Sequence, residues 1–183
     1  KPVVSIIMGS TSDLPVMEKA AKFFDEMEIP FEMNALSAHR TPAEVEAFAK
    51  EAAGRGLKVI IAGAGMAAAL PGVIAANTKL PVIGVPIKGM LDGLDAMLSI
   101  IQMPPGIPVA TVGVNGAQNA AILAAQMLSR LMKDWLAFGG FAAGEVFLDL
   151  VTDHLVGRSQ IHLDLGDLAG DALHEVQVGS VGR

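Results

Sequence analysis

The chain has 183 residues and a formal net charge of −6, and 52% of its residues are hydrophobic against 17% charged. The acidic balance and the lack of a basic stripe argue against nucleic-acid binding and against attachment to anionic membranes. Cysteine is absent, which excludes disulfides, thiolate metal sites and cysteine nucleophiles. Because so few residues are charged, we expect part of the apolar surface to be buried against copies of the chain in a homo-oligomer.

No apolar run is long enough to span a membrane, because Gly, Pro or a charged residue interrupts each one. The N-terminus leads directly into a predicted strand, so we expect no signal peptide. The absence of cysteine is compatible with a reducing compartment, and we expect a cytoplasmic location.

Short hydrophobic segments alternate with helical segments over residues 1–137. We predict strands at residues 3–8, 31–36, 58–62, 81–85 and 108–112, helices at residues 14–27, 42–54, 91–101 and 115–137, and an Ala-rich segment up to residue 77. This alternation is typical of an α/β fold with a parallel five-stranded sheet covered on both faces. Residues 138–183 differ in character, and we expect an arm that packs on a neighbouring subunit or is weakly ordered.

Open parallel sheets bind ligands at the carboxyl ends of their strands, and the segment after the first predicted strand is polar. Residues 9–13 read Gly-Ser-Thr-Ser-Asp, which places three hydroxyls and several backbone N–H groups at a helix N-terminus. Such a turn binds an anion, or it caps only its own helix. No Gly-Lys-Ser/Thr follows, so a phosphate monoester fits better than a nucleoside triphosphate.

The segment after the second predicted strand contains His39, the only histidine in the first 150 residues, beside Arg40. An imidazole can carry a proton, and a guanidinium can hold phosphate or carboxylate. A His-Arg pair before a helix is often an exposed pair without a function, but its position at a strand end favours a functional role. Thr41, Pro42 and Glu44 predict a capping box that starts the next helix.

The segment after the third predicted strand begins Gly63-Ala64-Gly65 and matches the loose dinucleotide pattern G-x-G-x-x-A. Its context argues against NAD, because it follows the third strand and no acidic residue ends the next one. Small residues here predict close approach of the backbone to a ligand. We predict that the three strand-end segments converge on one site.

Other chemistries find little support in the sequence. Asp92 and Asp95 lie three residues apart, but a solvated or interface helix face explains them. No histidine–carboxylate cluster in the main body has metal-ligand spacing, so we expect no metal. The G-x-S-x-G motif of serine hydrolases is absent.

The three motifs MGSTSD, SAHRTP and AGAG, each after its own strand, resemble those of the class I PurE family, the N5-carboxyaminoimidazole ribonucleotide mutases of purine biosynthesis. LPVIGVP, SIIQMPPGIPVATV and NAAILAAQ extend the resemblance over residues 3–132. It implies a flavodoxin-like three-layer α/β/α fold, a homo-octamer and no cofactor. It also implies isomerisation of the carbamate ribonucleotide to 4-carboxy-5-aminoimidazole ribonucleotide through transient CO2.

The resemblance implies roles for particular residues. His39 shuttles the proton at the reacting ring carbon. Ser10, Ser12 and Asp13 contact the carboxylate, phosphate and ribose of the substrate, and Ser37 and Arg40 hold the phosphate. Gly63, Ala64 and Gly65 lie along the base. The other two substrate-binding residues are Ala38 and Leu70.

Two positions depart from the family pattern GAGGAAHLPG: a glycine is replaced by Met66 and a histidine by Ala69. Three alternatives therefore stand: a working mutase, a carboxylase (lyase) that uses free CO2 on aminoimidazole ribonucleotide, and an engineered or diverged assembly scaffold with reduced or no activity. The spelling SAHRTP, without a lysine, favours the mutase over the carboxylase.

Overall fold

The computed structural model describes the backbone of residues 1–139 and the side chains of residues 1–129. The arm predicted at 138–183 lies outside the described residues from residue 140 onward. The elements in chain order are β1 (Val4–Met8), a 3-10 turn (Thr11–Asp13), α1 (Leu14–Glu26), β2 (Phe31–Ala35), α2 (Pro42–Arg55), β3 (Val59–Gly65), α3 (Leu70–Asn77), β4 (Val82–Ile87), α4 (Leu94–Ile101), β5 (Ala110–Thr111) and α5 (Ala117–Gly139).

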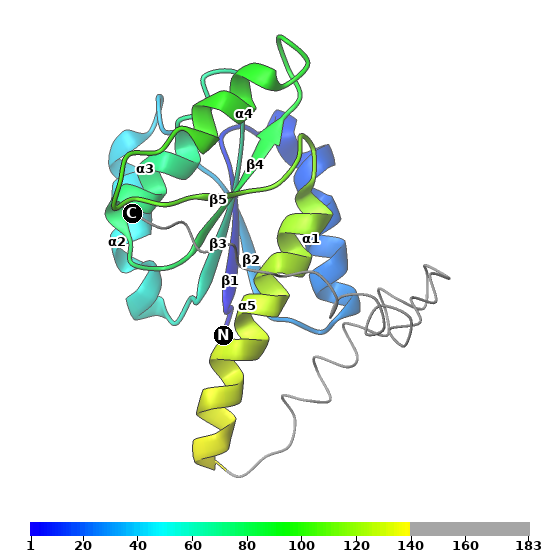
Figure 1. Cartoon of the computed structure of the whole chain (residues 1–183), viewed down its shortest axis with the longest axis vertical. Coiled ribbons are helices and arrows are strands. Elements are labelled where there is room, and N and C mark those ends of the chain that lie inside the picture. Colours follow the sequence, from blue (N-terminus) through cyan, green and yellow to red (C-terminus); the bar gives the residue numbers. More distant parts are fainter. Residues whose placement is uncertain (140–183) are drawn as a thin grey trace, which may run out of the picture. The chain divides into compact units, whose positions relative to one another are not determined.

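The five strands form one parallel sheet in the order β2-β1-β3-β4-β5 (Figure 1). This order is that of flavodoxin-like folds, so the predicted fold class is confirmed. Because all strands run the same way, their carboxyl ends meet at one edge of the sheet, where the order also reverses between β1 and β3.

Helices cover both faces of the sheet (Figure 1). On one face, α2, α3 and α4 bury apolar side chains such as Phe48, Ile74 and Ile100 against Ile7 and Ile60. On the other face α1 packs against α5. Helix α1 buries Met17 and Phe24 completely, at a spacing that keeps both on one helical face. Each such side chain contributes about 1.5–3 kcal/mol when fully buried.

Strands β3 and β4 are longer than the sequence predicted. Gly63-Ala64-Gly65, expected as a loop, are the last residues of β3 and pair with Val85-Pro86-Ile87 of β4. These small residues still pair as a strand, because β4 continues beside them. A Cβ at Gly65 would lie 3.4 Å from the Ile87 carbonyl oxygen, which is close but ordinary van der Waals contact.

No helix in the described part of the chain has the length and apolar character needed to cross a membrane.

Candidate active site

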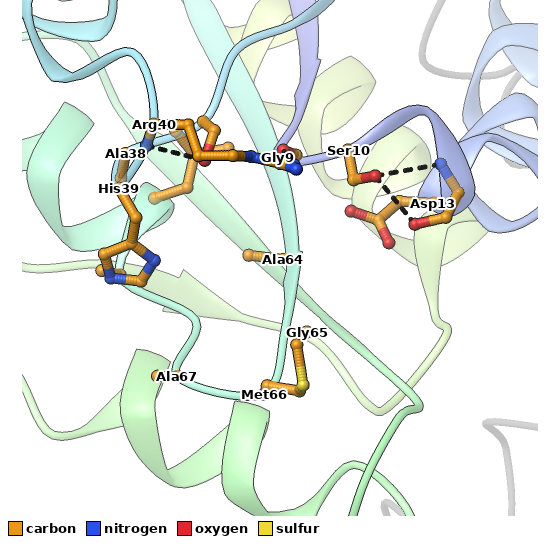
Figure 2. Close-up of a pocket in the computed structure, with 14 residues that line it drawn as sticks. Gly9, Ser10, Asp13, Ala38, His39, Arg40, Ala64, Gly65, Met66 and Ala67 are labelled. Carbon is orange, nitrogen blue, oxygen red and sulfur yellow. Dashed lines mark hydrogen bonds between the residues drawn. The ribbon is translucent and has the colours of Figure 1, made fainter.

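A cleft of about 440 Å³ opens at the carboxyl edge of the sheet, where β1, β2 and β3 end (Figure 2). Its lining comes from the three segments that the sequence singled out, at residues 9–13, 37–40 and 64–70. The predicted residues found there are Ser10, Ser12, Asp13, Ser37, Ala38, His39, Arg40, Ala64, Gly65 and Leu70, together with Gly9, Met66, Ala67 and Ala69, which were not predicted as site residues.

Gly63 is the one predicted site residue that the cleft does not include. Its missing side chain faces the helix layer, because a Cβ at Gly63 would collide with the Met17 side chain of α1. Its carbonyl oxygen accepts a hydrogen bond from the Gly9 N–H at 3.1 Å. Gly63 therefore serves helix packing and the joining of β1 to β3.

The segment after β1 folds into a 3-10 turn that leads into α1. Ser10 is extended, with φ −155° and ψ 151°, and its hydroxyl accepts from the Ser12 N–H at 3.3 Å. The Ser10 and Ser12 hydroxyls are themselves hydrogen-bonded at 2.9 Å. The capping interpretation therefore holds for Ser10, and both serines also line the cleft.

Asp13 ends this turn with only 9% of its surface exposed. Burial raises the pKa of its carboxyl group, while hydrogen bonds from the Ser10 backbone and the Ser12 side chain act in the opposite direction. A partly desolvated carboxyl at the cleft wall is a strong acceptor for hydroxyl groups of a ligand.

The segment after β2 is a tight turn held from both ends. The Thr41 N–H and hydroxyl both donate to the Ser37 carbonyl oxygen, at 2.8 and 3.1 Å, and the Ser37 N–H donates to the Thr41 hydroxyl at 3.0 Å. The predicted capping box is therefore wrong, because the Thr41 hydroxyl turns back to Ser37 and makes no cap hydrogen bond. Pro42 does begin α2, as expected.

This turn presents His39 and Arg40 to the cleft. The Arg40 N–H donates to the Ser37 hydroxyl at 3.2 Å, and its Nη2 donates to the Gly9 carbonyl oxygen at 3.3 Å, which ties the turn to the segment after β1. No salt bridge to Arg40 occurs among the described side chains, so its remaining donors are available to an anion. Figure 2 shows the His39 imidazole projecting toward residues 64–67.

The wall opposite the histidine turn carries the departures from the family pattern. Met66 is 59% exposed and has φ +50°, a left-handed conformation that favours glycine. Ala69 precedes α3 and offers no side-chain cap to that helix. The first N–H groups of α3 therefore lack side-chain partners beside the cleft.

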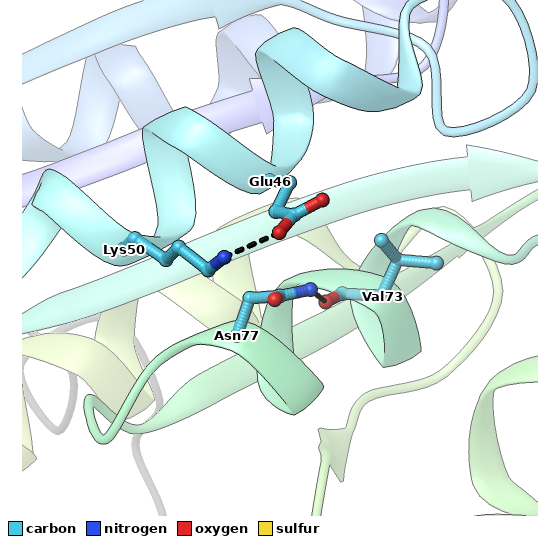
Figure 3. Close-up of polar contacts among 4 residues, drawn as sticks. All are labelled: Glu46, Lys50, Val73 and Asn77. Carbon is cyan, nitrogen blue, oxygen red and sulfur yellow. Dashed lines mark hydrogen bonds and ion pairs between the residues drawn. The ribbon is translucent and has the colours of Figure 1, made fainter.

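A second cavity of about 450 Å³ lies between the carboxyl-terminal ends of α2 and α3, lined by Lys50, Ala53, Ala76, Asn77, Thr78 and Lys79. Two of its polar side chains are engaged (Figure 3): Lys50 pairs with Glu46, and Asn77 Nδ2 donates to the Val73 carbonyl oxygen at 2.9 Å. Lys79 is exposed and has no ion pair among the described side chains. Helix carboxyl-terminal ends carry partial negative charge, which disfavours anions there. The volumes of the two cavities do not distinguish them, but the partial charge at the neighbouring helix ends does.

The remaining acidic candidates stay outside the cleft. Asp92 pairs with Lys88 at 2.9 Å, as expected for a solvated surface, and Asp95 lies in the first turn of α4. Across the described residues, no three His, Asp or Glu side chains gather closely enough to hold a metal ion.

Comparison with known proteins identifies relatives of this chain. Residues 3–136 match the family described as AIR carboxylase. The N5-carboxyaminoimidazole ribonucleotide mutase of Pyrococcus abyssi is 63% identical over 129 residues, which cover 70% of this chain and 74% of that protein. The phosphoribosylaminoimidazole carboxylase of Candida glabrata is 60% identical over 129 residues, but the match covers only 23% of that longer protein. The crystal structure of Treponema denticola PurE superposes with a TM-score of 0.69 at 30% identity, covering 87% of this chain and 93% of that one.

Proposed function

The chain belongs to the AIR carboxylase family, and we propose that it is an N5-carboxyaminoimidazole ribonucleotide mutase, an isomerase of de novo purine biosynthesis. The observation that carries the proposal is the meeting of an imidazole, an unpaired guanidinium and a hydroxyl-rich turn on one cleft. Three relatives at 60–63% identity bear the mutase name, which supports the proposal.

In this reaction one C–N bond breaks and one C–C bond forms. The carbamate nitrogen gains a proton as it loses CO2, and ring carbon C4 loses a proton as it captures the same CO2. His39 gives the first proton and receives the second, so it ends in its starting state. Imidazole suits this exchange because it gives and takes protons near neutral pH.

The cleft divides into a phosphate end and a base end. Arg40 and the hydroxyls of Ser10 and Ser12 hold the phosphate, since charge-assisted hydrogen bonds are the strongest available there. Asp13 accepts from ribose hydroxyls. Ala64 and Gly65 add little bulk along the base, which lets the ring approach the strand end. The volume of about 440 Å³ is within the usual range for small-molecule pockets and holds CO2 beside the ring while it waits for capture.

The alternative is a carboxylase that adds free CO2 to aminoimidazole ribonucleotide. The fungal relative named phosphoribosylaminoimidazole carboxylase favours it, although this chain matches only 23% of that protein. One assay separates the two. The purified protein receives either the carbamate in bicarbonate-free buffer or aminoimidazole ribonucleotide with bicarbonate. A mutase turns over the first at low enzyme concentration, and a carboxylase requires the second.

A homo-octamer in the cytoplasm completes the proposal. Leu94, Leu98 and Ile101 of α4 lie on one helical face and are 56%, 42% and 49% exposed, which supports burial against a second copy. The number of copies rests on the family resemblance. Light scattering tests it: Leu98→Glu places a charge on this face and should shift the mass toward smaller species, whereas an unchanged mass would remove α4 from the interface.

A further inference from the structure

Two exposed thioethers have no role in the proposed chemistry. Met66 lines the cleft and is 59% exposed, and Met90, on the loop after β4, is 68% exposed. The two segments approach each other, because a Cβ at Gly89 would lie 3.7 Å from the Met66 Cγ. By contrast, Met8 and Met17 are only 3% and 0% exposed, so the sheet and α1 shield them.

An exposed thioether reacts with hydrogen peroxide. The sulfur lone pair attacks one peroxide oxygen, the O–O bond breaks, and methionine sulfoxide and water form. The sulfur gives two electrons and the peroxide receives them. The product is polar and chiral, and reductases convert it back to methionine.

We propose that Met66 is a peroxide-sensitive modification site that controls ligand binding in the cleft, an inference that rests on the proposed function. The substrate is anionic, and it is held by Arg40 and by backbone and hydroxyl donors. A sulfoxide at residue 66 brings an oxygen acceptor with partial negative charge to the same cleft. That oxygen repels the substrate carboxylate and competes for the donors, so oxidation lowers affinity.

The geometry makes this effect specific to one methionine. Met66 is fixed at the end of β3 by a backbone with φ +50°, and the Ala68 N–H donates to its carbonyl oxygen at 2.9 Å. Its side chain therefore begins at the cleft wall (Figure 2). Met90 is as exposed but does not line the cleft. Oxidation of Met90 should change the surface without changing affinity.

The test measures oxidation and binding in the full chain. The protein is pulsed with hydrogen peroxide, each methionine is followed by peptide mass mapping, and binding of 4-carboxy-5-aminoimidazole ribonucleotide is measured by calorimetry. We expect Met66 and Met90 to oxidise before Met17, and the ribonucleotide to protect Met66 alone. Oxidation should raise the Kd roughly tenfold, the effect of weakening one charge-assisted contact, and methionine sulfoxide reductase should restore it.

Two variants make the outcome decisive, each compared with itself before and after peroxide. Met66→Leu should lose the sensitivity of its Kd, and Met90→Leu should keep it. An equal Kd rise in oxidised Met66→Leu, or full affinity in protein fully oxidised at Met66, overturns the inference alone. A failure of untreated protein to bind the ribonucleotide overturns the proposed function as well.

Discussion

Two cavities of nearly equal volume, about 440 and 450 Å³, differ in what their polar groups are doing. At the carboxyl edge of the sheet, Arg40 retains free donors and His39 projects into the space. Between α2 and α3, Lys50 is paired with Glu46 and Asn77 bonds within its own helix, whereas Lys79 is exposed and has no ion pair among the described side chains. Helix beginnings face the first cavity and helix ends face the second, so the backbone field favours anions only in the first. The imidazole and the direction of the helix ends distinguish the first cavity from the second, whereas volume and the presence of a cation do not.

Removal of the proton carrier from the first cavity should have the largest effect. His39→Asn keeps a polar side chain of similar size but cannot shuttle a proton, so we expect mutase turnover to fall by about 10²–10⁴-fold. The melting temperature should stay unchanged, because His39 is exposed and its side chain makes no hydrogen bond or ion pair with the described side chains. Turnover within tenfold of the parent protein would take the proton transfer away from His39.

The next largest effect separates the two cavities directly by their cations. Arg40→Ala should weaken ribonucleotide binding by about 2 kcal/mol, because charge-assisted hydrogen bonds to phosphate are lost. Lys50→Ala and Lys79→Ala are the matched controls in the other cavity, and calorimetry should find their affinities unchanged. If a lysine variant weakens binding as much as the arginine variant does, the phosphate binds in the second cavity and not beside Arg40.

The wall of the cleft that carries Met66 and Ala69 departs from the family pattern, and a double variant tests whether these departures reduce activity. Met66→Gly with Ala69→His restores the family pattern and removes a side chain from a left-handed backbone that costs about 1–2 kcal/mol for a non-glycine residue. We expect kcat/KM to rise severalfold. Unchanged kinetics would mean that both departures are neutral, and no turnover in either protein would favour the scaffold alternative.

The smallest effect is a pH dependence at Asp13. Burial raises the pKa of its carboxyl group, so ionising it costs more in the folded than in the unfolded chain. Stability from this group is therefore full at low pH and is lost as pH rises through the folded pKa. Asp13→Asn should raise the melting temperature at pH 7 but not near pH 3. The opposite trend would mean that the hydrogen bonds from Ser10 and Ser12 dominate.

Sequence reasoning predicted the convergence of three segments because parallel strands share one carboxyl edge. It did not show that Gly63 faces α1 and not the cleft, because the direction of that residue depends on how far β3 continues its pairing with β4. It also assigned the Thr41 hydroxyl to the wrong partner, since the local turn with Ser37 competes with helix capping. The cavity between α2 and α3 had no sequence signal, because it arises from where two helices end.

The central claim is that the phosphorylated ribonucleotide lies in the cleft with its ring beside His39. A crystal structure of the protein with bound 4-carboxy-5-aminoimidazole ribonucleotide tests it most directly. We expect phosphate oxygens within hydrogen-bond distance of Arg40 and the Ser10 turn, and ring carbon C4 facing the His39 imidazole. Phosphate bound between Lys50 and Lys79, or a ring directed away from His39, would contradict it.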